Sequence, residues 1–495
     1  MSTSERGSSA RPHLNAHLLS WGALALLAGL ALALVLAAVS AALLGVLALA
    51  ALAIYSPFAL LAAVLVLSPL RTLIQTEASL QLPLDIGQLL LLGFAGWWSL
   101  QRLLTNQRML TVRWTMLALP LGAFVMWGMV SWLWAWSLSA AITESIKWLT
   151  VLIVALFVLY HAGGGRWRWL IAALVVAATA NALVGIYIFF GGSGADHLLI
   201  NDRFFRAFGT FGQPNPFGGF MGISFPLSLA LTVDYAHLWL KHKQARFAGL
   251  SALAAVCALL IAAALVMSWS RGAWLSVIGA VFVMVVMLPH RFIHSALLLA
   301  VLSAGGLFIW TSGLLPASIA QRISSSTEEF FAFDDMRGVD ITTENYAVVE
   351  RLAHWQAALN MAQAHPFGVG LGSFNAAYAE HRLLNWPQAL GHAHNYYLNV
   401  LAETGIIGLA AYAAFQGSAL YFAARGRIHP SLSVRYLAIA LLGSWVYVAL
   451  HSLLDNLYVN NVFIHVGVLL GLTFWVYRQS ALTTTTEYHG NGATV

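Results

Sequence analysis

The chain has 495 residues, of which 60% are hydrophobic and only 8% are charged, and its net charge is +6. Because a soluble domain carries about 25% charged residues, this composition predicts a polytopic membrane protein. The single cysteine, Cys257, lies inside an apolar run, which excludes intramolecular disulfides and cysteine-based metal sites. The basic residues are dispersed among loops, so nucleic acid is not an expected partner.

Apolar runs of about 17 to 25 residues, the length that crosses a bilayer, recur along most of the chain. They predict an all-α, polytopic integral membrane protein with about 12 to 14 transmembrane helices and one large extracytoplasmic loop. The predicted spans are 17–68 (two or three passes), 86–104, 114–136, 142–161, 167–190, 215–239, 246–267, 272–289, 292–312, 396–423, 433–453 and 460–478. Ser56-Pro57 and Ser68-Pro69 can each mark a turn, which leaves the number of passes in the first block open.

Five segments follow from these runs. A cytoplasmic tail over residues 1–16 precedes transmembrane helices over 17–312. The large extracytoplasmic loop occupies 313–395, three further helices occupy 396–478, and a second cytoplasmic tail occupies 479–495.

Charges alternate between successive loops. One set of loops is basic and nearly free of acids; it contains Arg102, Arg108, Arg113, Arg166, Arg168, Lys241, Lys243, Arg246, Arg291, Arg425, Arg427 and Arg435. The opposite loops contain Glu77, Asp85, Glu144, Asp196, Asp202, Glu328, Glu329, Asp334, Asp335, Asp340, Glu344, Glu350 and Glu380. By the positive-inside rule the basic loops are cytoplasmic. The large loop and the stretch "GHAHNYYLNVLAETGIIGL" at 391–409 are therefore expected on the outer face.

The large loop contains one clear helical pattern. Residues 345–364 read as an amphipathic helix with Val348, Leu352, Trp355 and Leu359 at helical spacing. His365-Pro366 should end it, because a residue before proline avoids the helical region. The following "FGVGLGSF" places Gly368, Gly370 and Gly372 in alternation. No Lys-Ser/Thr follows, so tight backbone packing is favoured over a phosphate loop.

Three arginines are expected on the outer face, where basic residues are scarce. Arg203 and Arg206 lie in "DRFFRAFGTFGQPNPFGG", and Arg271 lies in "SWSRGAWL" at a span boundary. A single arginine there could snorkel to lipid headgroups. Three together favour an anion site, because guanidinium groups match the oxygens of phosphate or pyrophosphate in bidentate fashion.

The segments "RAFGTFGQPNPFG", "SWSRGAWL" and "GHAHNYYLNVLAETGIIGL" resemble the motif set of the bacterial O-antigen ligase and O-antigen polymerase superfamily. "ERLAHWQAALNMAQAHPFGVGLGSF" is similar to the lead-in to that family's large outer loop. In order and topology the resemblance extends over about residues 140–460. It implies a GT-C-like, all-helical glycosyltransferase on the outer face of the bacterial inner membrane, which needs no metal or cofactor.

The resemblance also implies substrates and roles. The donor is a glycan on undecaprenyl pyrophosphate, and the acceptor is a lipid or glycan, with lipid A-core the first expectation. His394 occupies the catalytic position, and Arg203, Arg206 and Arg271 fall where the family binds pyrophosphate. The chemistry fits these residue types: a neutral histidine is a suitable base for the acceptor hydroxyl, and arginines stabilise an anionic leaving group without a divalent cation.

The polar residues near His394 could each have either a structural or a substrate-binding role. Asn395 is predicted to bind substrate or to cap the helix at Tyr396. Asn399 and Glu403 share a helical face with it, so they either line the cavity or bond a neighbouring helix; Glu403 is assigned to substrate. His392 and His394 could form a metal pair, but no third ligand is evident from the spacing.

Two further pairs and one acidic dipeptide were weighed in the same way. His451, assigned to the substrate cavity, could instead form a structural pair with Asp455 at i,i+4. Glu144 and Lys147, at i,i+3, are expected to form an ion pair. Asp334-Asp335 reads as a solvated turn more readily than as a metal pair.

Transport is the competing class, because flippases also have about a dozen helices. A transporter should show internal repeats and broken helices near the midplane. No internal duplication is evident, and the charged residues gather at the outer boundary. Among enzymes, an O-antigen ligase is the first prediction, followed by an O-antigen or exopolysaccharide polymerase and then a protein O-oligosaccharyltransferase.

Overall fold

A computed structural model describes residues 55–70, 86–104, 111–192, 195–200, 203–289, 291–315, 337–342 and 345–490, with isolated positions between them. Within these residues nine helices are long and apolar enough to cross a membrane. They are Val112–Leu133, Leu138–His161, Trp167–Gly192, Pro214–His242, Ala245–Met267, Ile293–Thr311, Tyr396–Gly426, Leu432–His451 and Val462–Thr483. Two shorter apolar helices, Pro57–Leu70 and Arg271–Met287, accompany them. The prediction of an all-α polytopic membrane protein is confirmed.

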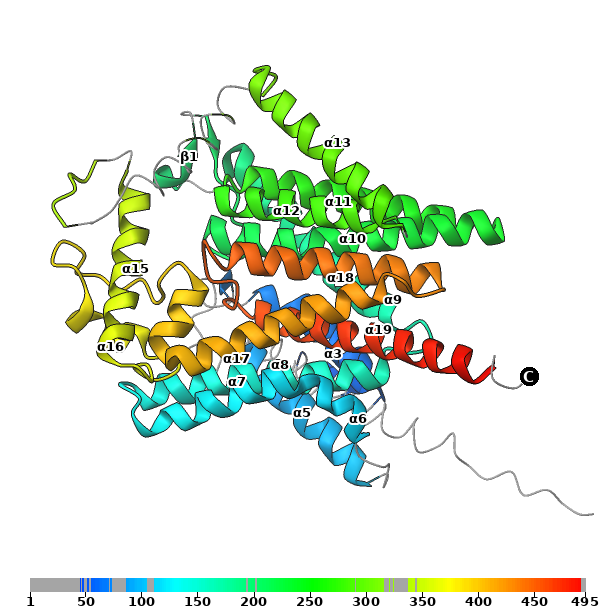
Figure 1. The fold of residues 1–495 in the computed structure, drawn as a ribbon, viewed down its shortest axis with the longest axis horizontal. Helices are drawn as coiled ribbons and strands as arrows, with labels where there is room; N and C mark the ends of the chain where they lie inside the picture. Colours follow the sequence, from blue (N-terminus) through cyan, green and yellow to red (C-terminus); the bar gives the residue numbers. More distant parts are fainter. Residues whose placement is uncertain are drawn as a thin grey trace, which may run out of the picture.

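Figure 1 labels the helices and strand β1. The helices are α3 (Pro57–Leu67), α5 (Ile86–Leu104), α6 (Val112–Thr115), α7 (Leu119–Val130), α8 (Leu138–His161), α9 (Trp167–Tyr187), α10 (Pro214–His242), α11 (Ala245–Met267), α12 (Arg271–Met287), α13 (Phe292–Thr311), α15 (Tyr346–Ala364), α16 (Phe374–His381), α17 (Tyr396–Gly426), α18 (Leu432–His451) and α19 (Val462–Gly490). Short helical turns are η1 (Ser68–Leu70), η2 (Met116–Ala118), η3 (Ser131–Leu133), η4 (Ile188–Gly192) and η5 (Asp196–Leu198). Strands β1 (Leu199–Ile200) and β2 (Phe204–Phe205) pair antiparallel.

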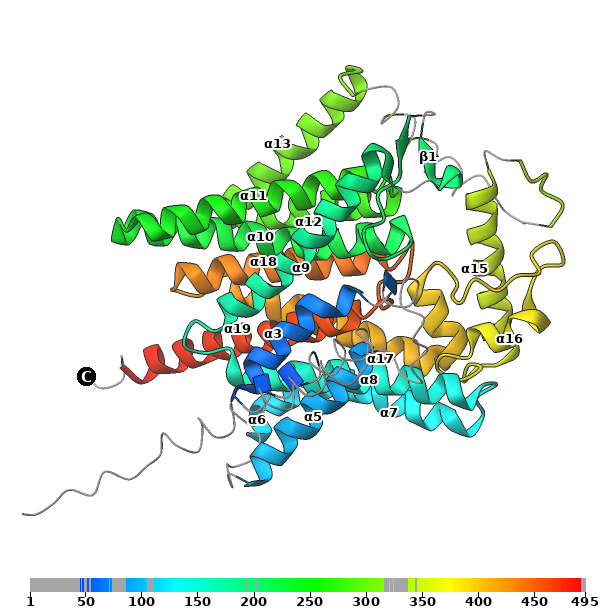
Figure 2. The ribbon, with the colours of Figure 1, turned by 180° about the vertical axis from the view of Figure 1, so that it is seen from behind.

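The long helices run roughly along one direction, and α15 and α16 lie together at one end of them (Figure 1). Seen from behind, α3, α5 and α9 cover the bundle on the other side (Figure 2). The central helix is α19, whose membrane span has 83% of its residues buried, whereas the span in α13 has only 6% buried. An apolar helix that packs so little against its own chain is suited to contact lipid.

The predicted spans from 86–104 onward each coincide with a helical segment, and their ends agree within a few residues except at α19, which continues past the predicted end at 478 to Gly490. Most of the predicted first block, 17–68, lies outside the described residues, so the total of 12 to 14 passes stays a prediction. The Ser56-Pro57 turn is present, because α3 begins there with Pro57 as its first residue and Ser56 as its N-cap.

Helix α15 begins at Tyr346 and ends before His365-Pro366, as predicted. Its buried face agrees with the predicted one in part, because Val348 is fully buried. Leu359 is 37% exposed, whereas Val349, Ala353 and Met361 are buried. Small alanines face the interior because α15 packs closely against α17 and α16, and that close approach leaves no room for a row of large side chains.

Helix α17 is broken at Gly405, whose φ is 66° and ψ is −170°. A Cβ there would lie 2.2 Å from the carbonyl oxygen of Pro366, so only glycine fits. The opposing Gly368, with φ 81°, would likewise collide with the backbone of Glu403. The amide of Gly370 donates to the Glu403 carbonyl at 2.8 Å. The predicted tight packing of the glycine-rich loop is confirmed, and it fixes the start of α17.

Candidate functional site

The site is built around the short loop that precedes α17. His394 in this loop has φ 51°, in the left-handed region that few residues other than glycine adopt, although asparagine, aspartate and histidine enter it more readily than the rest. The side chain of Asn395 accepts the amide of Leu398 at 3.1 Å and caps α17. One turn further, Asn399 accepts the amide of Ala393 at 3.1 Å. Such a conformation persists only where surrounding bonds enforce it.

The end of α18 meets the start of α17 directly. The amide of Tyr396 donates to the carbonyl of Ser452 at 2.7 Å. Three residues later Asp455 donates its amide to the carbonyl of His451, which continues the α18 turn. The Asp455 carboxylate thereby comes to lie beside the imidazole of His394, although the two residues are 61 positions apart.

His394 and Asp455 form a hydrogen-bonded pair. The Nδ1 atom of His394 lies 3.3 Å from Oδ1 of Asp455, and Asp455 is almost fully buried. Since a carboxylate can only accept, the proton of a neutral His394 lies on Nδ1. Nε2 is buried, and within the described residues it has no hydrogen-bond partner. Its lone pair is therefore available to take a proton from a bound hydroxyl group.

Burial acts to raise the pKa of the Asp455 carboxyl. The bond from His394 and the positive charge of nearby residues outweigh burial and hold this pKa well below its usual range. Asp455 is therefore ionised, and a negative charge beside Nδ1 stabilises the imidazolium that forms when Nε2 accepts a proton.

His392 completes the cluster. Its Nδ1 accepts the backbone amide of His394 at 3.0 Å, so its own proton lies on Nε2, which faces Oδ1 of Asp455 at 3.8 Å. Burial lowers the pKa of His392 to about 4, with the neighbouring His394 acting in the same direction. His392 is thus neutral at ordinary pH and helps to orient His394 through the loop backbone.

The spacing alone showed no third metal ligand, but the structure supplies one. Ligand atoms of His392, His394 and Asp455 lie within 4.8 Å of one another. The hydrogen bonding does not suit a metal, however. His392 would have to coordinate through Nε2, which carries the proton while Nδ1 accepts the His394 amide. A metal ion there would require the hydrogen bond from the His394 amide to His392 to break. The three side chains therefore fit a proton-transfer site better than a metal site.

Arg351, on α15, was not identified from the sequence. Its guanidinium group interacts electrostatically with the Asp455 carboxylate and with the guanidinium group of Arg271. Burial lowers the pKa of Arg351 below its usual range, and Asp455 opposes that shift. Two arginines close enough to repel each other are stabilised by an anion between them, which is the requirement of a pyrophosphate site.

His354 lies one turn after Arg351 on the same helix. Its ring centre is 6.0 Å from that of His394, and its Nδ1 lies 2.7 Å from the carbonyl of Glu350. Burial lowers the pKa of His354. α15 therefore brings one cationic and one neutral aromatic side chain to the same site.

Arg271 and Arg206 come from neighbouring segments. Arg271 is the first residue of α12, and the next residue, Gly272, packs against Leu454 at the end of α18. Arg206 donates from Nε to the carbonyl of Ser268 at 3.1 Å and from Nη2 to Asn215 at 3.2 Å. The two predicted arginines thus lie in segments that contact each other and that border the His394–Asp455 pair.

Arg203 is placed differently. It is exposed, and its guanidinium group lies 5.0 Å from the centre of the Phe204 ring. Within the described part of the chain, no contact joins it to His394, Arg206 or Arg271.

Three predicted substrate residues have structural partners. Asn395 caps α17, the alternative foreseen for it. Both carboxylate oxygens of Glu403 accept loop amides, from Gly372 at 2.9 Å and Phe374 at 3.3 Å. His451 is buried and stacks on Tyr447 at 5.4 Å between ring centres. These contacts leave any substrate role for the three residues a prediction.

Two expected pairs have opposite outcomes. Glu144 and Lys147 form the predicted ion pair. Asp455, by contrast, directs its carboxylate to His394 and His392, so the predicted side-chain pair with His451 is replaced. Asp334-Asp335 lies outside the described residues.

Comparison with known families agrees with the motif resemblance. Residues 255–413 match the family described as O-antigen ligase. The match includes Arg271, Arg351 and His394 and ends before Asp455. A search of curated proteins found no match.

Proposed function

Residues 255–413 match the family described as O-antigen ligase, and from this match we propose that the chain is a glycosyltransferase that moves a glycan from undecaprenyl pyrophosphate to a lipid or glycan acceptor. The observation that carries the proposal is the pairing of His394 with Asp455 beside Arg351 and Arg271. These side chains supply a base, its orienting carboxylate and a cationic site for the leaving group.

The acceptor hydroxyl group is activated by His394. The hydroxyl donates to the lone pair on Nε2, and the proton moves to that nitrogen as the oxygen attacks the anomeric carbon of the donor sugar. Asp455 holds the ring through Nδ1 and stabilises the resulting imidazolium.

The leaving group is handled by the arginines. As the new bond to the acceptor oxygen forms, the bond from the anomeric carbon to the phosphate oxygen breaks and its electron pair leaves with the lipid pyrophosphate. Arg271 and Arg351 stabilise the added negative charge. Arg206, anchored to the Ser268 carbonyl and Asn215, borders the same site and binds the distal phosphate. The chain's own residues provide every charge that this reaction needs.

A ligase is favoured because the matched family is described as O-antigen ligase. A polymerase would use the same donor half of the site and differ only in the acceptor. Deleting the gene separates the two: full-length polymer left on the lipid carrier indicates a ligase, whereas single repeat units indicate a polymerase. Transfer by the purified protein in detergent, without any ion gradient, tests the enzyme class itself, and its absence would favour transport.

The side of the membrane that the site faces can be tested independently of activity. The site is proposed to face the outer side of the bacterial inner membrane, because the loops at the other end of the helices are basic. In a chain without Cys257, a cysteine placed at Asn385 should react with a membrane-impermeant reagent in intact cells. Cysteines at Lys243 and Arg427 should react only after lysis. The reverse pattern would contradict the orientation and the mechanism together.

A further inference from the structure

A second polar cavity lies at the far end of the helix bundle from His394. α8 begins near the Ser373 turn, where the amide of Ser137 donates to Ser373 at 3.2 Å, and it ends at His161 on the wall of this cavity. A helix of 24 residues is about 36 Å long, which exceeds the hydrocarbon thickness of about 30 Å. The cavity therefore opens at the membrane face opposite the candidate active site.

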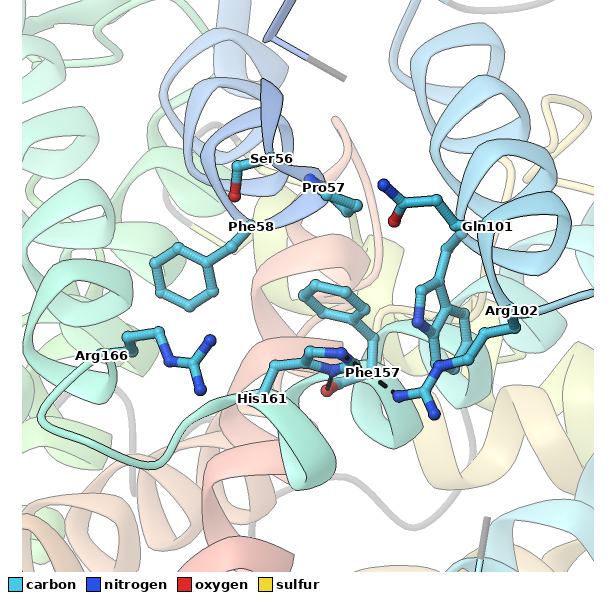
Figure 3. A pocket seen from close by; sticks show the side chains of 9 residues that line it. Ser56, Pro57, Phe58, Gln101, Arg102, Phe157, His161 and Arg166 are labelled. Carbon is cyan, nitrogen blue, oxygen red and sulfur yellow. Dashed lines mark hydrogen bonds between the residues drawn. The ribbon is translucent and has the colours of Figure 1, made fainter. Parts of the chain in front are cut away.

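Figure 3 shows the cavity from close by. Its volume is about 270 Å³. It is lined by the start of α3, the end of α5, the end of α8 and the turn that follows α8; these contribute Phe58, Trp98, Arg102, Phe157, His161 and Arg166. Polar groups and aromatic walls thus surround a space at the depth of lipid headgroups.

Arg102 and Arg166 are the charged residues that line this cavity, and they lie on opposite sides of His161 (Figure 3). Both guanidinium groups lie within electrostatic range of the His161 ring. Arg166 is held only within its own turn, where Nε donates to the carbonyl of Gly163 at 3.1 Å. Among the described residues, neither arginine forms an ion pair with a carboxylate.

The nearby Arg168, the second residue of α9, has its charge neutralised by another residue of the chain. It makes a bidentate contact with the buried Asp234, at 2.6 Å and 3.3 Å. That carboxylate satisfies the charge of Arg168. Arg102 and Arg166 have no such carboxylate partner among the described residues. Their charges are therefore available to an anionic group that enters the cavity.

His161 orients Arg102 toward the space. The ring stacks on Phe157 at 4.2 Å between centres, and Nδ1 lies 2.7 Å from the Phe157 carbonyl. A carbonyl can only accept, so Nδ1 carries the proton and Nε2 accepts the Nη2 of Arg102 at 3.3 Å. One N–H of the Arg102 guanidinium group is thereby fixed. The orientation of this planar group is set before any ligand binds.

We propose that Arg102 and Arg166 bind a phosphate group in this cavity, carried by an anionic phospholipid or by inorganic phosphate. Guanidinium groups bind phosphate oxygens in bidentate fashion, and basic pockets between helices at a membrane surface bind anionic headgroups. The aromatic side chains of Phe58 and Trp98 provide an apolar wall for the glycerol and upper acyl carbons of a lipid. This site is independent of the proposed transferase chemistry.

The test uses the full chain purified in a neutral detergent. It is titrated separately with phosphatidylglycerol, phosphatidylcholine and inorganic phosphate, and bound ligand is read by native mass spectrometry and by thermal unfolding. Phosphatidylglycerol should bind more tightly than phosphatidylcholine. The double variant Arg102→Gln/Arg166→Gln should weaken this binding by about tenfold or more.

Arg246→Gln is the matched control, because Arg246 is exposed on the same predicted face and lies outside the cavity. If the double variant unfolds, the single variant Arg166→Gln replaces it, since that guanidinium group supports only its own turn. Competition by inorganic phosphate would assign the site to soluble phosphate, and its failure to compete would assign the site to lipid. Binding in the arginine variants as tight as in wild type and in Arg246→Gln would overturn the proposal.

Discussion

The two ends of the helix bundle hold their charged groups in different ways. At one end, His394 is fixed by its bond to Asp455, by the N-cap of Asn395 and by the amide it donates to His392. At the other end, Arg166 bonds a carbonyl of its own turn and no other group among the residues that the structure describes. The first end is built to keep one geometry, whereas at the second end His161 orients Arg102, and Arg166 can adjust around whatever it binds.

This difference follows from what each end is proposed to do. Bond formation at a sugar carbon needs a base that is already in place, because a small displacement of the base slows the reaction. Binding a mobile headgroup tolerates adjustment, because the charge of a guanidinium group acts over several ångströms. Substitutions at the rigid end should therefore change the rate of transfer by large factors.

The largest effect is expected from His394→Ala. Loss of the base should lower transfer by about a hundredfold to ten-thousandfold, the usual contribution of general-base catalysis. Donor binding should change little, because the arginines hold the pyrophosphate. Transfer from purified lipid-linked donor measures the rate, and donor affinity is measured in parallel.

His392→Ala is the control for this prediction and should be much milder. Near-normal turnover in His394→Ala, or loss of wild-type activity on adding a chelator, would contradict the assignment. The second outcome would favour a metal held by His392, His394 and Asp455.

Arg351→Ala should have the second-largest effect on the rate of transfer. Removing one cationic donor from the leaving-group site is expected to cost about a hundredfold to a thousandfold in kcat. Lysine should restore little, because an ammonium group lacks the bidentate fork. Arg382→Ala, a charge change elsewhere on the same loop, serves as the control. Equal activity in the Arg351 and Arg382 variants would remove Arg351 from the site.

Asp455→Asn should have an intermediate effect. The amide oxygen can still accept from Nδ1, but the negative charge that stabilises the imidazolium is lost. A charge-assisted hydrogen bond contributes about 1.5–3 kcal/mol, which corresponds to a decrease of about tenfold to a hundredfold. The decrease should appear in kcat, with KM for the donor nearly unchanged. A rise in KM with kcat intact would mean that Asp455 acts in binding instead.

The smallest expected effect is a decrease in the stability of the folded protein at low pH. Burial lowers the pKa of His392 from 6.5 to about 4, so between these values the unfolded chain binds a proton that the folded chain does not. Stability should therefore fall as the pH decreases from about 6.5 to about 4. The buried His354 acts in the same direction. Thermal unfolding across this range should be less pH-dependent in His392→Gln; an unchanged slope would contradict the prediction.

Much of the fold could be predicted from local patterns. Apolar runs located the spans after residue 86, and His365-Pro366 located the end of α15. The N-cap role of Asn395 and the packing role of the glycine-rich loop also follow from short-range rules, because turn and cap geometry depends on neighbouring residues.

The partners of His394 could not be predicted in that way. Asp455 reaches His394 only because the end of α18 bonds the start of α17. The i,i+4 spacing of His451 and Asp455 suggested a local pair that the tertiary contact replaces. Arg351 lies within a helix of ordinary pattern, and its only sequence signal is a positive charge in a loop rich in acids. Both residues depend on contacts between segments distant in sequence.

The left-handed backbone at His394 has a consequence for selection experiments. At a φ of 51°, glycine and asparagine are the residues that the backbone itself prefers. A library randomised at this position and sorted only for folded, membrane-inserted protein should become enriched in those two residues. The same library sorted for glycan transfer should return histidine. The divergence between the two populations would measure how far chemistry, rather than foldability, dictates the amino acid at position 394.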